Sequence, residues 1–331
     1  MKKLISLLLA ALMLLSLMTA CKAKAPETIN VYTLSGTTGF GMAKLMNDNT
    51  DGKYTFTNVG TNATQITDAL INGDVDIAAL PTNAAANLYN KTAGGVKILA
   101  VNTLGCLYLL TKEGITVSTF ADLRGKTVYV PTQNPTFIFT DLCKKNNLIP
   151  GTDITLLFAG ESDKNTYKTP EELADAIANE KIDIAVLPEP MVTIAMSKAK
   201  QNNVTLTNAL DLTAEWNKVN PEGSLVQGCI VVRTAFLEEH PEAVAEFLAS
   251  YKASITYLNE NPAQAAQMIA DNGIIGNATV AEKAIPKCNI CYLDGNEMKA
   301  AMEVYLTILS GINPTSIGGK LPSDDFYYIA K

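Results

Sequence analysis

Hydroxyl, amide and carboxylate side chains follow several short apolar runs of this 331-residue chain, at points where a segment with helical spacing begins. Such groups can hydrogen-bond a bound molecule, and in open α/β sheets ligands lie where strands lead into helix N-termini. We therefore predict that these side chains bind a small molecule. The predicted binding residues, with Gly36 contributing its backbone N–H, are Ser35, Gly36, Thr37, Thr38, Thr61, Asn62, Thr82, Asn83, Thr132, Gln133, Asn134, Glu161 and Glu189.

Residue types needed for catalysis are scarce. The single histidine, His240, stands directly before Pro241 at an expected helix start, and no catalytic serine or cysteine motif occurs. Cys288 and Cys291 have the two-residue spacing of zinc and redox sites, but no second such pair follows. We therefore predict a binding protein without catalytic residues, metal or cofactor.

Five cysteines follow Cys21, so they cannot all pair with one another. A local disulfide, a disulfide across a hinge and simple buried thiols all fit this pattern, and the sequence leaves the three alternatives open. The five are Cys106, Cys143, Cys229, Cys288 and Cys291.

The loop from Ser35 to Gly39 combines small residues with hydroxyls before an expected helix. This arrangement presents backbone N–H groups to a ligand oxygen. It lacks the lysine and the spacing of a phosphate-binding P-loop, so we do not expect a nucleotide.

A stretch of sixteen residues is written twice, as DALINGDVDIAALPTN at 68–83 and as DAIANEKIDIAVLPEP at 175–190, with eight identical positions. Each copy predicts an amphipathic helix, an apolar strand and a proline that ends the strand. We interpret the shared part as buried scaffold. The differing ends, Thr82-Asn83 and Glu189-Pro190, would contact different sides of one ligand. The alternative is that they only cap the next helix, for which Glu-Pro is the poorer pair.

The elements that position these residues alternate between strand and helix, which predicts two parallel-rich α/β sheets. Besides the repeats, strands are expected at residues 30–33, 54–59, 127–130 and 154–158. The C-terminal part is expected to be helical, over residues 241–258, from Pro262 to a stop at Gly273, and over residues 297–309.

Two apolar strand candidates begin with a glycine, at Gly105 and Gly228, and they bracket the second set of elements. We interpret these glycines as the two crossings of a hinge. Lobe I would then comprise residues 27–105 and 229–331, and lobe II residues 106–228. Closure of the lobes around a ligand is the predicted mechanism.

The N-terminus has the features of a secretory signal, with two lysines before an apolar run at residues 4–15. Small residues precede Cys21 in a pattern that resembles the bacterial lipobox. We predict a signal peptide at residues 1–20, a lipid anchor on Cys21 at the outer face of the cell membrane, and a tether at residues 21–26. An ordinary signal with an incidental cysteine is the alternative.

The charge of the chain restricts which classes of partner it can bind. Loss of the signal leaves 24 basic against 33 acidic residues, a net charge of −9, which makes nucleic acid a poor partner. No later run reaches the ~18 apolar residues of a membrane span. We expect an exported monomer of two lobes.

Taken together, the chain resembles the extracellular solute-binding proteins of ABC importers, in the family that binds sulfonates, taurine, nitrate and the thiamine pyrimidine precursor. The resemblance implies a type II periplasmic-binding-protein fold of the α/β class, with a two-strand hinge and a helical C-terminal extension. It also implies delivery of a solute to an ABC permease and its ATPase. It rests on the lipobox before Cys21, Asp122-Leu123-Arg124-Gly125-Lys126, Asp183-Ile184-Ala185 leading to Glu189-Pro190, and Glu239-His240-Pro241-Glu242 before Asn261-Pro262.

The ligand is not named by this resemblance. Neither Arg124 nor Arg233 stands at a strand end that faces the expected cleft, so no bidentate arginine clamp for a sulfonate is expected. Two glutamates in the predicted site add negative charge. A neutral or weakly basic heterocycle is therefore favoured, with Phe40 or Phe137 as a stacking face, and a sulfonate-type anion is the alternative.

Two other functions stay open. A relative of the pyrimidine synthases that share this fold would need a reactive histidine in the cleft, whereas His240 is expected outside it. A surface sensor that presents its ligand to a receptor would use the same binding residues.

Overall fold

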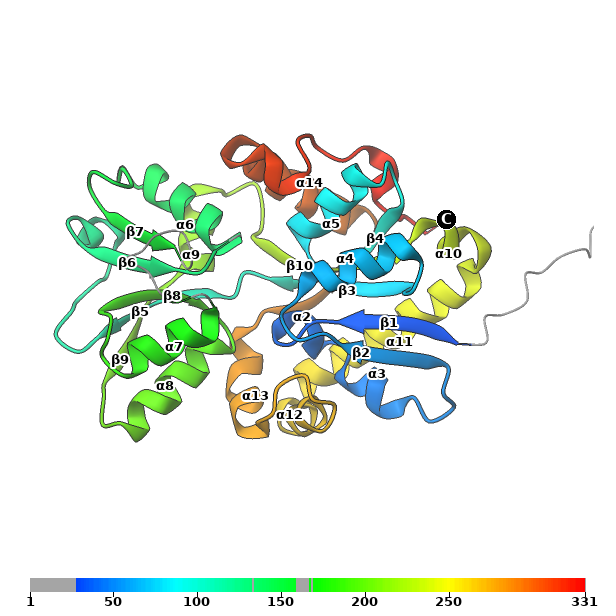
Figure 1. The fold of residues 1–331 in the computed structure, drawn as a ribbon, viewed down its shortest axis with the longest axis horizontal. Helices are drawn as coiled ribbons and strands as arrows, with labels where there is room; N and C mark the ends of the chain where they lie inside the picture. The colour runs from blue at the N-terminus through cyan, green and yellow to red at the C-terminus, as the bar shows by residue number, and fades with distance from the viewer. Residues whose placement is uncertain (1–27, 133, 159–166, 168, 331) are drawn as a thin grey trace, which may run out of the picture.

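The protein is described by a computed structural model that covers residues 28–132, 134–158, 167 and 169–330. The predicted signal peptide, Cys21 and the tether lie outside these residues. Figure 1 shows two α/β parts next to each other, one around each of two sheets. We call them the sheet A part and the sheet B part.

Sheet A has six strands among the described residues, in the order β11-β4-β10-β3-β1-β2. The strands β1, β2 and β3 pair in parallel, whereas β10 is antiparallel to both β3 and β4, and β11 is antiparallel to β4. Their bounds are β1 Ile29–Thr33, β2 Tyr54–Asn58, β3 Ile77–Pro81, β4 Val96–Leu104, β10 Val226–Arg233 and β11 Ile290–Leu293.

Sheet B has five described strands in the order β7-β6-β8-β5-β9. The strand β6 pairs in parallel with β7 and β8, and β5 runs antiparallel to β8 and β9. Their bounds are β5 Leu107–Lys112, β6 Thr127–Val130, β7 Thr155–Phe158, β8 Ile184–Pro188 and β9 Leu206–Asp211.

Five strands of each sheet follow the same order, as the repeated sequence stretch predicts. The order β2-β1-β3-β10-β4 in sheet A corresponds to β7-β6-β8-β5-β9 in sheet B, with β3 and β8 at the centre. These central strands are the two copies of the repeated stretch. Each sheet is mixed rather than parallel-rich, because β10 and β5 enter from the other part of the chain instead of following a βαβ crossover.

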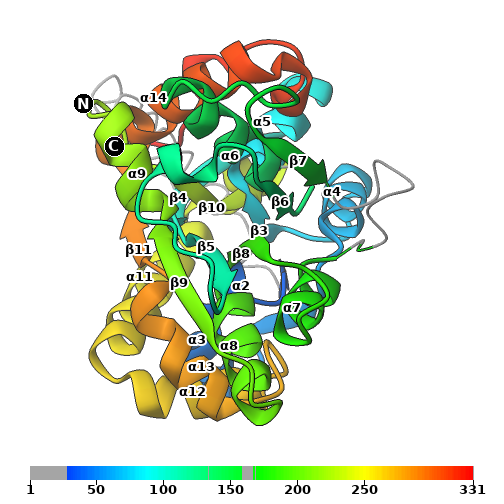
Figure 2. The same cartoon turned by 90° about the vertical axis from the view of Figure 1, so that its left-hand side faces the viewer.

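Helices cover both faces of the sheets (Figure 2). The described residues contain no helix long and apolar enough to span a membrane. The helices are α2 Thr37–Phe40, α3 Ala43–Asp48, α4 Ala63–Asn72, α5 Thr82–Lys91, α6 Asn134–Lys145, α7 Pro170–Ala178, α8 Met191–Gln201, α9 Leu212–Val219, α10 Thr234–Glu239, α11 Pro241–Glu260, α12 Pro262–Asp271, α13 Ala278–Ala284 and α14 Gly295–Ile312, with 3-10 turns η1 Phe120–Leu123, η2 Ile285–Lys287, η3 Pro314–Ile317 and η4 Asp324–Phe326.

Local sequence explains where several helices begin. The Thr169 hydroxyl accepts from the Glu172 N–H at the start of α7, and the Asp211 carboxylate caps α9 in the same way. Pro241 and Pro262 occupy the first turns of α11 and α12, as their fixed φ favours. The three predicted C-terminal helices are therefore confirmed, with α14 extending beyond its predicted range at both ends.

One apolar core continues from sheet A to sheet B. It includes Val101 and Tyr305 on one side, Trp216 and Phe139 on the other, and Leu225 between them, each buried. A second cluster fills the opposite face of sheet A, and a third packs α7 and α8 on sheet B.

Within the described residues, the chain passes between the parts twice. The first crossing is Gly105-Cys106, between β4 and β5, and the second is residues 220–225, between α9 and β10. Gly105 packs closely enough that a Cβ there would lie 2.2 Å from the Thr213 hydroxyl. Gly228 lies inside β10, where it pairs with Pro81, so the chain has joined sheet A before it reaches this glycine.

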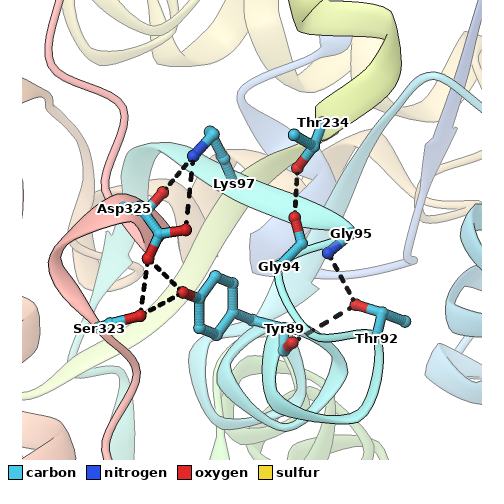
Figure 3. Close-up of polar contacts among 8 residues, drawn as sticks. All are labelled: Tyr89, Thr92, Gly94, Gly95, Lys97, Thr234, Ser323 and Asp325. Carbon is cyan, nitrogen blue, oxygen red and sulfur yellow. Dashed lines mark hydrogen bonds and ion pairs between the residues drawn. The ribbon is translucent and has the colours of Figure 1, made fainter.

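The C-terminal segment lies across α5 and the edge of β4 (Figure 3). Tyr327 forms a parallel bridge with Ile98, and the Tyr328 N–H donates to the Ile98 carbonyl at 3.0 Å. The Tyr89 hydroxyl of α5 bonds both Ser323 and Asp325. This segment therefore fixes α5 against the sheet.

Candidate functional site

The loop after β1 is held by its neighbours in sheet A. The Ser35 N–H donates to the Gly60 carbonyl at 2.8 Å, and the Ser35 hydroxyl donates to the Asn58 side chain at 3.2 Å. Asn58 in turn donates to the Gly273 carbonyl at 2.8 Å. These bonds hold the loop after β1 against the end of β2, where the predicted residues Thr61 and Asn62 follow in the chain.

The same loop reaches the sheet B part at its glycine. Gly36 has φ 85° and ψ −156°, a conformation that is essentially restricted to glycine. A Cβ on Gly36 would lie 3.6 Å from Cδ of Pro190, so the ends of β1 and β8 face each other across the junction. The Thr37 hydroxyl lies 4.0 Å from the Cys106 sulfur in the first crossing. The helix that follows, α2, has only four residues, so its dipole at this loop is small.

Glu189 is buried at the end of β8, behind a cis peptide to Pro190. Its carboxylate accepts hydrogen bonds from the N–H and the hydroxyl of Thr193, at 3.1 and 3.0 Å. Burial raises the pKa of Glu189 above its ordinary value, and the bonds from Thr193 and the charge of Lys287 oppose that shift. The side chain thus turns toward the first turn of α8.

Lys287 of η2 is the residue that the sequence did not single out. Its Nζ lies 3.9 Å from the Glu189 carboxylate, and its side chain is 45% exposed. The Tyr108 hydroxyl of β5 donates to the Lys287 carbonyl at 3.0 Å. Lys287 stands directly before the Cys288 to Cys291 pair, whose spacing suggests only metal, redox or disulfide chemistry. No sequence signal therefore places this lysine opposite the repeated strand.

Two of the predicted residues in sheet A form structural bonds. The buried Thr82 hydroxyl donates to the Val226 carbonyl at 2.8 Å, which ties α5 to the end of the second crossing. Asn62 caps α4 by accepting from the Gln65 N–H at 3.2 Å. Asn83 is half-buried in the first turn of α5, and Thr61 is exposed beside Asn62.

The start of α6, which follows β6 in the sheet B part, carries the amide side chain of Asn134. Asn134 is the first residue of this helix and only 7% exposed, and its Oδ1 has no hydrogen-bond partner within the described part of the chain. Thr132 precedes it and is half-buried. Gln133 and Glu161, two other predicted site residues, lie outside the described residues.

The two aromatic residues suggested as stacking faces have other surroundings. Phe40 is fully buried in the core beside α11, so it offers no face to a ligand. Phe137 lines a surface groove with Phe158 and Ile312, on the side of α6 that meets the end of α14.

Both arginines are paired outside this site. Arg233 bonds Asp76 at 2.9 Å, at the edge of sheet A opposite to the Pro81 end of β3. Arg124 bonds Asp153 and, at 3.2 Å, the Asn147 carbonyl. Arg233, the last residue of β10, thus lies at the end of sheet A away from Gly36, and its guanidinium is paired there.

All five cysteines after Cys21 lie in the described residues, and each is a free thiol. Cys291 is half-buried and the other four are buried. Removal from water raises the pKa of Cys106, Cys143 and Cys291 to about 12. Among the three alternatives, the structure thus shows unpaired thiols. No group of three or more metal-binding side chains occurs within the described ranges.

The paired sheets, the antiparallel strands exchanged at the two crossings and the strand ends that meet at the junction define a periplasmic-binding-protein fold. The chain belongs to the NMT1/THI5-like family, whose match spans residues 57–265. This agrees with the family suggested by the sequence. A search of curated proteins gives no significant match.

Solved structures are similar over nearly the whole chain. An ABC transporter protein from Parabacteroides distasonis has a TM-score of 0.76 and 24% identity, with 92% of this chain and 100% of that one covered. The ligand-binding component of an ABC-type import system from Staphylococcus aureus has a TM-score of 0.67, 16% identity, and coverage of 92% and 97%. The aliphatic sulphonate binding protein SsuA from Escherichia coli has a TM-score of 0.67, 16% identity, and coverage of 92% and 94%.

Proposed function

We propose that this protein captures a small organic solute between its two parts and delivers it to the permease of an ABC importer. The observation that carries the proposal is the approach of Gly36 to Pro190, since it brings the carboxyl ends of β1 and β8 together at the junction. Ligands of open α/β sheets bind at such ends. The similar proteins described as an ABC transporter and as the ligand-binding component of an ABC-type import system support the same role.

The ligand in this proposal is a neutral or weakly basic heterocycle. Both arginines are committed to aspartates elsewhere, and Lys287 is already paired with the buried Glu189 carboxylate at 3.9 Å, so a second anion beside that carboxylate would be disfavoured. Asn134 adds an amide at a helix start, which can hydrogen-bond a ring carbonyl or ring N–H. A sulfonate-type anion is the second candidate, because SsuA of the same fold is described as a sulphonate-binding protein.

The proposal includes a cellular setting. The protein would be exported by residues 1–20, anchored through Cys21 and monomeric, with lobes that close around the solute. His240 lies between α10 and α11, where its ring is 5.0 Å from Phe236, so its position does not favour the enzyme alternative.

A thermal-shift screen tests the proposal. The panel holds sulfonates, nitrate, thiamine precursors, riboflavin, amino acids and nucleobases, measured against the chain from residue 22 onward. A ligand at 100 times its dissociation constant adds about 2.7 kcal/mol to the free energy of unfolding. A heterocycle that raises the melting temperature, followed by a decrease in the radius of gyration, supports capture by closure. Binding without compaction would contradict closure, and a hit restricted to sulfonates would replace the ligand class.

A further inference from the structure

The second crossing, residues 220–225, is contacted by side chains of three helices. From α9, the Trp216 indole N–H donates to the Gly223 carbonyl at 3.2 Å. From α6, the Lys145 ammonium donates to the Asn220 side-chain oxygen. From α14, Val304 lies so close that a Cβ on Gly223 would be 2.2 Å from its Cγ1. The crossing is therefore a fixed part of the junction rather than a free linker.

Lys145 is the polar centre of this arrangement. Its Nζ lies 3.3 Å from the carboxylate of Asp141, one turn earlier in α6, and 6.0 Å from the centre of the Trp216 ring. The Lys145 side chain is 34% exposed and that of Asp141 only 11%. A charge-assisted bond from a partly buried ammonium is stronger than one between neutral groups. The bond to Asn220 thus links α6 of the sheet B part to the segment that leads back into sheet A.

The helix α6 connects the candidate site with the second crossing. It begins at Asn134, in the candidate site, and ends at Lys145, at the crossing. A twelve-residue helix is about 18 Å long. Rigid secondary elements of this kind can carry energetic coupling between two sites. A displacement of Asn134 would therefore also displace Lys145 at the crossing.

We propose that Lys145 is a positioning residue that couples the Asn134 end of the candidate site to the second crossing through α6. The role of Asn134 in this coupling rests on the proposed function. A ligand that displaces the start of α6 also displaces Lys145 at the other end of the helix. Through its bond to Asn220, Lys145 then moves the second crossing and changes the orientation of the sheet A part relative to the sheet B part. The coupling needs no contact between Lys145 and the ligand.

Amide hydrogen exchange of the ligand-free protein tests the coupling. The main variant is Asn220→Ala, which removes the crossing's acceptor and leaves the Lys145–Asp141 pair intact. Exchange at Asn220 and Gly223, whose N–H groups bond Trp216 and Asn220 carbonyls, should become about tenfold faster. Ile138 and Phe139, one turn into α6, should also exchange faster, because the far end of the helix is released.

Lys145→Met also leaves Asp141 without its ion pair, so exchange at the same amides should be at least as fast as in Asn220→Ala. The double variant should be no faster than Lys145→Met alone, because Asn220 acts through its bond to Lys145. Lys144→Met is the matched control, with the same change of side chain one position earlier, and should behave as wild type. Unchanged exchange at the crossing in Asn220→Ala would overturn the proposal. Faster exchange confined to Asn220 and Gly223 would overturn the coupling to the site. Because no ligand is used, failure here leaves the capture of a solute untouched.

Discussion

The ammonium of Lys287 lies 3.9 Å from the buried carboxylate of Glu189. The two residues come from different parts of the fold, η2 beside sheet A and the end of β8 in sheet B. The bond from Tyr108 to the Lys287 carbonyl adds a second link at the same place. The end of the repeated strand is thus one place where the two parts make polar contact, and the Glu189 carboxylate takes part in that contact.

Glu189 makes the stability of the protein depend on pH. Its pKa is raised in the folded state above the ordinary value of 4.5, so the folded protein holds this proton more tightly than the unfolded chain. The stabilisation from the proton is complete below pH 4.5 and is lost as pH rises through the folded pKa. Glu189→Gln cannot lose a proton. The free energy of unfolding of the variant, minus that of wild type, should therefore increase with pH across this window.

Urea unfolding from pH 4 to pH 8 measures this difference. Glu113→Gln, at an exposed position, serves as the control and should give a difference that changes little over the same range. A flat difference for Glu189→Gln would mean that the folded and unfolded pKa values of Glu189 are equal.

Lys287→Met should push the pKa of Glu189 higher still. The charge of Lys287 lowers that pKa in the folded protein, and methionine keeps an unbranched side chain without the charge. The pH window over which wild type and Glu189→Gln diverge should therefore extend to higher pH in the Lys287→Met background. Lys283→Met, in the neighbouring α13, is the control and should leave the window in place. Carboxyl carbon shifts of Glu189 measured by NMR give the same answer directly.

Gly36→Ala should destabilise the protein by about 1 to 3 kcal/mol, since φ 85° with ψ −156° is strained for any residue with a Cβ. Space is not the cause, because the nearest atom to the added Cβ would be 3.6 Å away. Gly276→Ala is the comparison: its Cβ meets nothing within 4 Å. Chemical denaturation of both variants measures the cost. An equal, small effect at the two glycines would show that the loop relaxes without strain.

The fold could be predicted further than the site, and the repeated stretch shows why. Apolar periodicity and the closing proline predict a strand in each repeated stretch, and β3 and β8 are found there, ending at Pro81 and Pro188, because burial of such a run depends mainly on local pattern. The antiparallel entries of β10 and β5 were not foreseen, since the pairing partners are far away in the chain. Thr82 and Glu189 were chosen by position. Their hydrogen bonds to Val226 and Thr193, and the approach of Lys287, depend on packing that no spacing encodes.

The unpartnered amide of Asn134 gives the sharpest prediction about the ligand. Its oxygen is buried without a hydrogen-bond partner in the described residues, so a bound ring N–H that reaches it would gain a bond at little cost. Asn134→Ala should therefore weaken binding of the heterocycle that gives the largest thermal shift, by about 1 to 3 kcal/mol. Asn83→Ala, at the start of α5, compares a half-buried amide at the other predicted helix start. Titration calorimetry of the two variants measures both losses. A full loss at Asn83 with none at Asn134 would place the ligand against β3 rather than against α6, and an unchanged affinity in both would move it away from these helix starts.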